Sequence, residues 1–433
     1  MKKHYIKIAI GLLMLIFGFG QAFSNNNQIE NMIYTDSVYI SGIKSVQLEK
    51  NGLMLSEPVI TLNSGDYLNL SFDDFDLNIN DLYYTVLHCD FDWKQSEIWQ
   101  NEYLYLDMED QITDYEYSFG TLLPYVHYNL VFPNDRIVIT KSGNYILQVY
   151  TKTPDGDKNV YFTKRFYVVE PLTSIVGSAK RAASAEYFDT KQEVNFTVNT
   201  GDLYVSSPFQ EIKVAVLQNY RWDNALLDLK PKMVRNNIID YNFDDDRNLF
   251  DGGNEFRYLN LRTLRSAIDK IAHIEYTDTI HKVYTRPESF RTFKNYIFEK
   301  DANGKYFLET DDERSVNTMG EYAEVHFRLS APAPNVEGDF YVAGRFNDWK
   351  YNHENIMTYD YRNKMYTANI ILKQGYYDYV YMFVDRKNPV GDVTVVEGNH
   401  SETVNIYTVL VYYKAIGSRY DRLIGFLEIE SGK

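Results

Sequence analysis

The sequence predicts an all-β fold, built of two or three immunoglobulin-like antiparallel β-sandwich units in tandem. Short segments of alternating apolar and polar residues recur along the chain, and turn signals such as Asn51-Gly52 and Pro154-Asp155-Gly156 separate them. Tyrosine is abundant, with 39 residues, and suits half-buried strands because its ring packs while its hydroxyl reaches water. Helical periodicity is scarce, which favours sandwiches over an α/β fold.

Residues 1–24 have the pattern of a secretory signal peptide. Lysines at the start precede an apolar stretch over residues 8–20, and the small residues Ala22 and Ser24 follow it. As a helix this stretch spans about 20 Å, which is too short to cross a bilayer. We therefore expect cleavage before Asn25 and an exported protein.

The single cysteine and the charge limit the class of protein further. Cys89 has no partner for an internal disulfide, and no cysteine near the expected cleavage site could carry a lipid anchor. The formal net charge is −16, and loss of the leader with its lysines makes the chain more acidic. Such a charge repels nucleic acid and anionic lipid headgroups.

The first predicted unit covers residues 25–171. Tyr145, Leu147 and Val149 fall on one face of a strand, and Pro171 follows the last predicted strand of this unit. The spacing of strands and turns is typical of an antiparallel sandwich.

The middle unit is predicted over residues 172–310. Val194, Phe196 and Val198 alternate with polar residues, as in a strand with one buried face. The turn sequence at 301–304 predicts a hairpin between strands at 296–298 and 306–308.

A third unit and tail are predicted over residues 311–433. Val325, Phe327 and Leu329 alternate in a strand, and a strand ending in Gly344-Arg345-Phe346-Asn347-Asp348-Trp349 follows. This part resembles early-set immunoglobulin-like domains related to glycogen-binding modules. Such modules stack sugar rings on two tryptophans. Trp349 matches the first, but no tryptophan follows Asp385, so packing of Trp349 in the sandwich is favoured over carbohydrate binding.

Two further blocks of sequence carry a second resemblance. The first block, within residues 83–150, contains His88-Cys89-Asp90 with Trp93, Ser96 and Trp99, then Asp114-Tyr115, Tyr125 and His127-Tyr128, and then Ser142-Gly143-Asn144-Tyr145. The second block is Gly252-Gly253-Asn254-Glu255-Phe256-Arg257. The chain resembles the plug protein family of the type IX secretion system of Bacteroidetes, long described as a domain of unknown function. The resemblance covers nearly everything after the leader.

The resemblance implies a non-enzymatic subunit in the periplasm, associated with the outer membrane through a protein partner. That partner would be the large outer-membrane translocon barrel, whose periplasmic opening the plug closes when no cargo is present. Large aromatic residues and arginine dominate the binding energy of many interfaces. The candidate contact residues are therefore Trp93, Trp99, Tyr125, Tyr128 and Arg257, although each could instead belong to a sandwich core or turn.

No cofactor, metal or catalytic site is predicted. Asp244, Asp246, Asn248 and Glu255 fit positions of a calcium loop, but Leu249 replaces the glycine that its sharp turn requires. The chain contains no H-E-x-x-H and no G-x-S-x-G motif, and the surroundings of the only cysteine favour a buried thiol over a nucleophile. We therefore expect that the protein is not an enzyme.

Two alternatives from other classes remain open at this stage. Many tyrosines and short strands also occur in outer-membrane β-barrels, although the predicted strands are shorter than such barrels need and charged turns separate them. The second alternative is an exported carbohydrate-binding or surface glycan-binding sandwich protein. This interpretation is based on the third unit alone.

Overall fold

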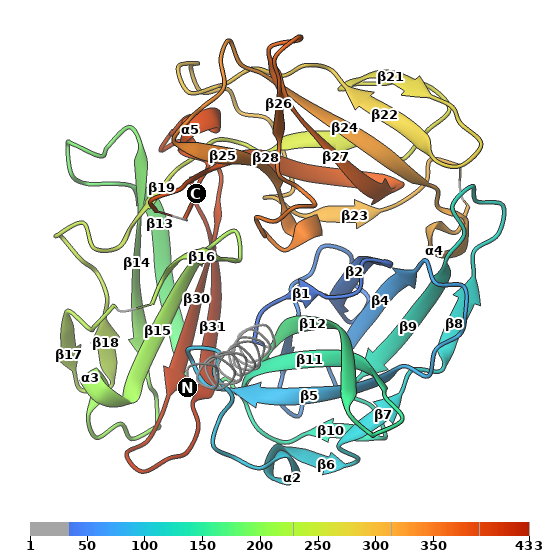
Figure 1. Cartoon of the computed structure of the whole chain (residues 1–433). Coiled ribbons are helices and arrows are strands. Elements are labelled where there is room, and N and C mark those ends of the chain that lie inside the picture. Colours follow the sequence, from blue (N-terminus) through green and yellow to red (C-terminus); the bar gives the residue numbers. More distant parts are fainter. Residues whose placement is uncertain (1–33, 228, 313, 389, 433) are drawn as a thin grey trace, which may run out of the picture.

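The computed structural model describes residues 34–432 except 228, 313 and 389, so the predicted signal peptide lies outside the described residues. Three β-sandwiches lie around a common centre, the first at the lower right of Figure 1, the middle one at the left and the third at the top. The predicted all-β fold of sandwich units is therefore confirmed. Within the described residues, no helix combines the length and apolar composition needed to span a membrane.

The first sandwich consists of two facing sheets and a small strand pair. One sheet has the order β1-β12-β11-β5-β7, with β3 parallel to β12, and the other has the order β2-β4-β9-β8. The bounds are β1 Ser37–Val38, β2 Ile43–Lys50, β3 Val59–Thr61, β4 Leu68–Asp74, β5 Tyr83–Cys89, α2 Gln100–Tyr103, β6 Leu104–Leu106, β7 Glu109–Gln111, β8 Asp114–Tyr117, β9 Val126–Phe132, β10 Ile137–Ile139, β11 Gly143–Lys152 and β12 Lys158–Val169, with β6 paired to β10.

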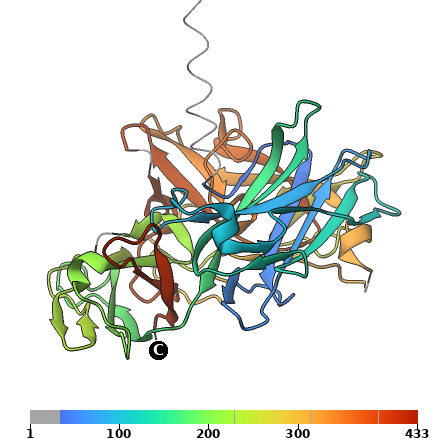
Figure 2. The ribbon, with the colours of Figure 1, turned by 90° about the horizontal axis from the view of Figure 1, so that it is seen from below.

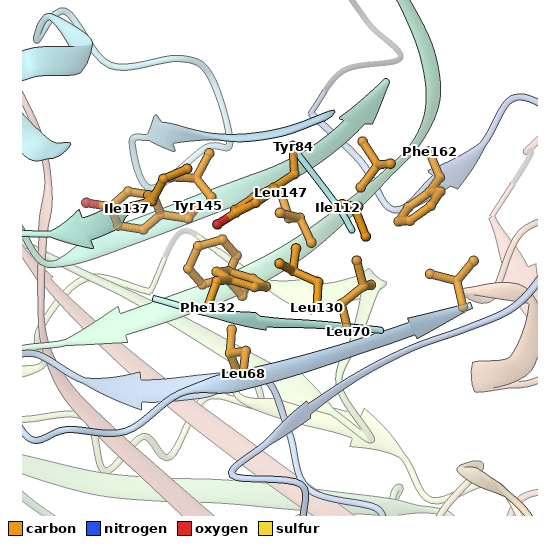
Figure 3. Packing of buried hydrophobic residues seen from close by; sticks show 14 of the residues in the cluster. Leu68, Leu70, Tyr84, Ile112, Leu130, Phe132, Ile137, Tyr145, Leu147 and Phe162 are labelled. Carbon is orange, nitrogen blue, oxygen red and sulfur yellow. The ribbon is translucent and has the colours of Figure 1, made fainter. Parts of the chain in front are cut away.

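The core of this sandwich follows from the period of two in its strands. Leu68 and Leu70 of β4 face Tyr145 and Leu147 of β11, and all four side chains are fully buried (Figure 3). Phe132 of β9 completes this layer. The alternation predicted for β11 is thus present, and the opposite face of β11 is buried as well.

The middle sandwich is completed by the end of the chain. Its sheets have the orders β13-β14-β18-β17, with β19 beside β14, and β16-β15-β30-β31. The bounds are β13 Ser174–Arg181, β14 Lys191–Asn199, α3 Pro208–Glu211, β15 Ile212–Gln218, β16 Arg221–Leu226, β17 Met233–Arg235, β18 Ile238–Asp240, β19 Leu249–Asp251, β30 Ile406–Tyr413 and β31 Arg422–Glu430. Both views place the C-terminus at this sandwich (Figures 1 and 2).

The third sandwich is formed by the chain between β19 and β30. In one sheet β20, β23, β25 and β29 all pair with β28, and the other has the order β21-β22-β24-β27-β26. The bounds are β20 Arg257–Asn260, β21 Ile271–Glu275, β22 His281–Thr285, β23 Tyr306–Leu308, α4 Val316–Met319, β24 Tyr322–Ser330, β25 Gly338–Ala343, η1 Arg345–Asn347, β26 Thr358–Asp360, β27 Met365–Lys373, β28 Gly375–Asp385, β29 Gly391–Asp392 and α5 Thr394–Glu397.

The sheets divide the chain differently from the sequence-based expectation. The expected boundary between residues 310 and 311 falls inside the third sandwich, and residues 406–430 belong to the middle one. The reason is pairing between distant segments, since β30 forms its ladder with β15. The hairpin expected around 301–304 is also absent, because 296–298 is not a strand and β23 pairs with β28.

The first and middle sandwiches meet through an apolar layer. The outer faces of β5, β11 and β12 pack against β15, β30 and β31, and this first–middle junction contains Trp93, Ile146 and Tyr167 from one side and Leu410 and Tyr412 from the other. Because these apolar side chains are removed from water, the contact between the two sandwiches is stable.

The third sandwich meets the first through polar groups. Asp73 of β4 accepts hydrogen bonds from Tyr322 Oη at 2.5 Å and from Lys373 Nζ at 2.6 Å, and its other oxygen lies 2.6 Å from His127 Nδ1. Lys164 also pairs with Asp348 at 2.6 Å. This first–third junction therefore depends on ion pairs and hydrogen bonds that are largely buried.

Candidate partner-binding surface

Trp93 lies inside the first–middle junction, not on the surface. It is 4% exposed and ends a tight turn in which its N–H donates to Asp90 O at 2.9 Å. Its ring meets Trp222 edge-on at 5.4 Å, and the Arg165 guanidinium lies 4.2 Å from the ring centre. Trp93 therefore joins two sandwiches and is not available to a partner.

Tyr125 and Tyr128 are also fully buried. Tyr125 Oη donates to Gly320 O at 3.0 Å, and Lys373 Nζ lies 4.2 Å from its ring centre, so Tyr125 belongs to the first–third junction. Tyr128 stacks on Phe72 at 5.0 Å within the first core.

Arg257 is held inside the third sandwich. Its guanidinium lies 2.9 Å from Glu397 and 3.1 Å from Glu288, and it is 7% exposed. Burial alone would lower the pKa of Arg257, but the two carboxylates outweigh it and raise the pKa. Four of the five predicted contact residues are thus buried, because a large aromatic or an arginine serves a junction as well as it serves an interface. The expectation that they contact a partner is corrected accordingly.

Trp99 is the predicted contact residue that remains exposed, with 75% of its surface accessible. It is the N-cap residue just before α2, where its N–H donates to Glu102 Oε1 at 2.7 Å, and Glu102 is paired with Arg419. The Arg419 guanidinium lowers the pKa of Glu102, which keeps this carboxylate charged. The indole is therefore presented from a segment with a fixed backbone.

Two further apolar side chains follow in β6. Tyr105 is 63% exposed and Leu106 is 55% exposed, whereas Tyr103 and Leu104 before them are buried and anchor the segment. We call Trp99, Tyr105 and Leu106 the α2–β6 patch. Sequence reasoning missed Tyr105 and Leu106, because strand alternation would place Tyr103 and Tyr105 on the same face, whereas Tyr103 ends α2 and is buried.

Several residues of the sequence block within residues 83–150, among them Asp90 and Asn144, lie in or beside the first–middle junction. Asp90 pairs with Lys414 at 2.9 Å, Asn144 donates to Asp90 O at 3.2 Å, and Tyr412 Oη donates to Asn144 Oδ1 at 2.8 Å. His88 is buried and bonded to Ser142 O and Ser96 Oγ. Burial lowers the pKa of His88 to about 4, so its imidazole is neutral near pH 7.

The second sequence block, Gly252 to Arg257, holds together the two chain segments that enter and leave the third sandwich. His400 N donates to Gly253 O at 2.8 Å, and Asn254 Nδ2 donates to Glu397 O at 2.8 Å. A Cβ at Gly252 would lie 2.1 Å from His400 O, so only glycine allows this approach. We call this arrangement the insertion clamp.

Comparison with known proteins identifies the first sandwich. The family model described as the type 9 secretion system plug protein 1st domain matches residues 43–170. Residues 43–170 therefore form a first domain of the type IX secretion plug protein family. A solved structure, the crystal structure of a hypothetical protein from Parabacteroides merdae ATCC 43184, is 31% identical, has a TM-score of 0.88, and covers 92% of this chain and 99% of its own. No curated protein matches the chain.

The other candidate sites have structural partners. Asp244 pairs with Lys232, and Asn248 donates to Val194 O at 2.9 Å. Within the described residues no group of histidine, cysteine, aspartate and glutamate could hold a metal ion. Burial raises the pKa of the Cys89 thiol, which disfavours the thiolate that a nucleophile requires.

Trp349 cannot serve as a sugar platform in this structure. It is 7% exposed, and its ring is in contact with Gly304, with Phe256 at 5.9 Å between ring centres, and with Arg221 of the middle sandwich at 5.2 Å. The Trp349 ring is thus covered by protein. The packing role preferred from the sequence agrees with these contacts.

A buried carboxyl cluster lies beside the insertion clamp. Burial is the main reason that the pKa of Glu255 is raised to about 7 and the pKa of Asp378 to about 8. The carboxylate of Asp301 raises both pKa values further. Tyr296 Oη donates to Glu255, and Val404 N donates to Glu255 Oε1 at 3.2 Å. Glu255 and Asp378 therefore hold their protons more tightly than free carboxyl groups do.

Proposed function

We propose that this chain is a non-enzymatic, periplasmic plug subunit of the type IX secretion system. It binds the large outer-membrane translocon barrel and closes the periplasmic opening of that barrel when no cargo is present. The observation that carries this proposal is the match of the first sandwich to the first domain of the plug family. The expected signal peptide agrees with a location on the periplasmic side of the outer membrane.

The arrangement of the three sandwiches supports this role physically. Each sandwich contacts the other two: the apolar first–middle junction, the polar first–third junction, and the contact of Trp349 with Arg221 between middle and third. Because every pair of sandwiches is in contact, the molecule cannot bend at a single linker. A plug needs this rigidity, since it must keep its shape while it closes a pore. Its acidic charge also keeps the released form soluble.

The α2–β6 patch is the part of this body that we assign to the barrel. An exposed tryptophan and tyrosine on a fixed backbone lose little conformational entropy on binding, and such residues contribute about 2 kcal/mol or more each at interface hot spots. A patch of three side chains also leaves the rest of the contact free to be polar, which allows release.

The test is co-purification from gently solubilised outer membranes. The wild-type chain should retain a very large barrel, and cells without the chain should have a leaky outer membrane. The double variant Trp99→Ala/Tyr105→Ala should retain much less barrel with an unchanged melting temperature. The matched control is Tyr204→Ala/Tyr361→Ala, which removes two tyrosines that are 81% and 76% exposed on the other two sandwiches.

Two results would overturn parts of this proposal. Absence of any large barrel from the wild-type preparation, together with normal permeability of the deletion strain, would reject the plug role. Equal loss of barrel in the control variant and in the patch variant would reject the assignment to the α2–β6 patch alone.

A further inference from the structure

The strand β8 is an open edge of the first sandwich. It is the outermost strand of the sheet β2-β4-β9-β8, and all four of its residues, Asp114, Tyr115, Glu116 and Tyr117, are exposed. An exposed edge offers unpaired main-chain groups to any extended segment that can reach it. Natural proteins usually cover or block such edges, and the short length and the charges of β8 limit which strands can pair with it.

The register shows which main-chain groups of β8 face outward. Ser118 N donates to Tyr125 O at 2.9 Å, so this pair is hydrogen bonded, and such pairs alternate along an antiparallel ladder. Tyr115 and Tyr117 therefore point their N–H and C=O groups away from β9. In the part of the chain that the structure describes, no backbone hydrogen bond reaches these outward groups.

The side chains of β8 present two different faces to an incoming strand. Tyr115 and Tyr117 lie on the side of the first core, where Tyr115 meets the ring of Tyr128 at 5.8 Å but remains 40% exposed. Asp114 and Glu116 lie on the other side, and within the described residues no ion pair forms with either carboxylate. The edge therefore combines an apolar face with an uncompensated acidic face.

This charge distribution selects among possible strands. A second copy of β8 would place Asp114 and Glu116 against further carboxylates, and like charges across a ladder are destabilising. A basic strand would instead form opposite-charge pairs on one face and aromatic contacts on the other. We propose that β8 binds an extended basic peptide segment as an added strand, with lysine or arginine beside Asp114 and Glu116 and apolar side chains beside Tyr115 and Tyr117.

This site goes beyond the proposed plug function and does not depend on it. The α2–β6 patch binds through side chains, whereas β8 binds through its main chain and selects by charge. Failure of the barrel to co-purify would therefore leave the peptide site untouched.

The experiment measures binding of a labelled nine-residue peptide of alternating lysine and valine to the full chain by fluorescence anisotropy. The variant Asp114→Lys/Glu116→Lys should bind this peptide at least about tenfold more weakly, because two attractive cross-strand pairs become repulsive. The same variant should gain affinity for a peptide of alternating glutamate and valine. The matched control Asp155→Lys/Asp157→Lys, in the exposed turn between β11 and β12, should bind as the wild type does.

Two further measurements separate strand addition from simple charge attraction. A lysine–valine peptide with a central proline should bind at least about tenfold more weakly, and the intact peptide should protect the amides of Tyr115 and Tyr117 from hydrogen exchange. Tyr117→Pro removes one outward N–H without touching the ladder to β9, and should weaken binding of the intact peptide.

Equal binding of the intact and proline peptides, or an unchanged affinity of the charge-reversed variant, would overturn the proposal. A wild-type dimer that becomes monomeric in Tyr117→Pro would assign the edge to a second copy instead.

Discussion

Trp93 and Trp99 lie in the same short segment, and their side chains have opposite surroundings. Trp93 contacts Arg165 and Tyr167 of β12 and reaches Trp222 across the first–middle junction, while Trp99 extends into solvent. The same residue type thus stabilises the body at one position and is available to a partner at the other. Their difference can be measured as a difference in folding free energy.

Trp93→Ala should lower the free energy of unfolding by about 3 to 5 kcal/mol, because it leaves a cavity in a buried aromatic cluster. Trp99→Ala should change it by no more than about 0.5 kcal/mol, as exposed positions usually do. Urea unfolding of both variants followed by circular dichroism checks the pair. If Trp93→Ala were as stable as Trp99→Ala, the first–middle junction would not be an energetic unit.

Glu255 gives a prediction about pH. Its folded pKa of about 7 lies above the ordinary value of 4.5, so the folded state binds this proton more tightly than the unfolded state does. Its contribution to stability is therefore complete below about pH 4.5 and is lost as the pH rises through 7. Between pH 5 and pH 8 the wild type should lose about 1 to 3 kcal/mol more than Glu255→Gln, which cannot ionise.

Urea unfolding at pH 5, 6.5 and 8 measures this difference. The control is Glu337→Gln, an exposed loop residue, and its pH profile should follow the wild type. Parallel profiles for Glu255→Gln and the wild type would mean that Glu255 is ionised in the folded protein near neutral pH.

At the scale of elements, the insertion clamp is the arrangement most sensitive to a single atom. Gly252→Ala would push a Cβ against His400 O and separate the two segments that connect the third sandwich to the middle one. We expect a loss of about 2 to 4 kcal/mol and faster proteolysis between 252 and 256 and between 398 and 404. Limited proteolysis with mass spectrometry locates the cuts.

Gly156→Ala is the control for the clamp. Its φ of +89° strains any other residue, but no atom lies within 4 Å of the added Cβ, so the cost should be about 1 kcal/mol. New cleavage in Gly156→Ala at 252–256 would show that general destabilisation, and not the clamp, exposes these sites.

The strands themselves were predictable because their signal is local. Val194, Phe196 and Val198 alternate within β14 and are buried in the middle core, whichever strands flank them. Strand partners were not predictable, since the apolar run of β30 would suit any central position and only the folded chain places it beside β15. The same holds for Tyr125 and Tyr105, two tyrosines of the first sandwich, since Tyr125 is covered by the third sandwich and Tyr105 is exposed.

At the scale of the molecule, the junctions of the third sandwich differ in kind from the first–middle junction. Asp73→Ala would leave Lys373 buried without its carboxylate, which should cost about 3 to 5 kcal/mol. Glu354→Ala breaks the exposed pair with Lys44 across the same junction and should cost at most about 1 kcal/mol. Urea unfolding compares them, and hydrogen exchange should report loosening of β24 and β27 in the Asp73 variant alone. Equal costs would mean that the buried network adds nothing beyond a surface pair.

The position of β30 and β31 at the end of the chain has a consequence for the order of folding. The ribosome makes the whole third sandwich before it makes the two strands that complete the middle one. Until then β14 and β15 expose the apolar face that later contacts Tyr407, Val409 and Val411. This unfinished surface is the one that chaperones must protect for longest. A chain shortened by its last two strands would therefore keep two complete sandwiches and leave the middle one permanently open to aggregation.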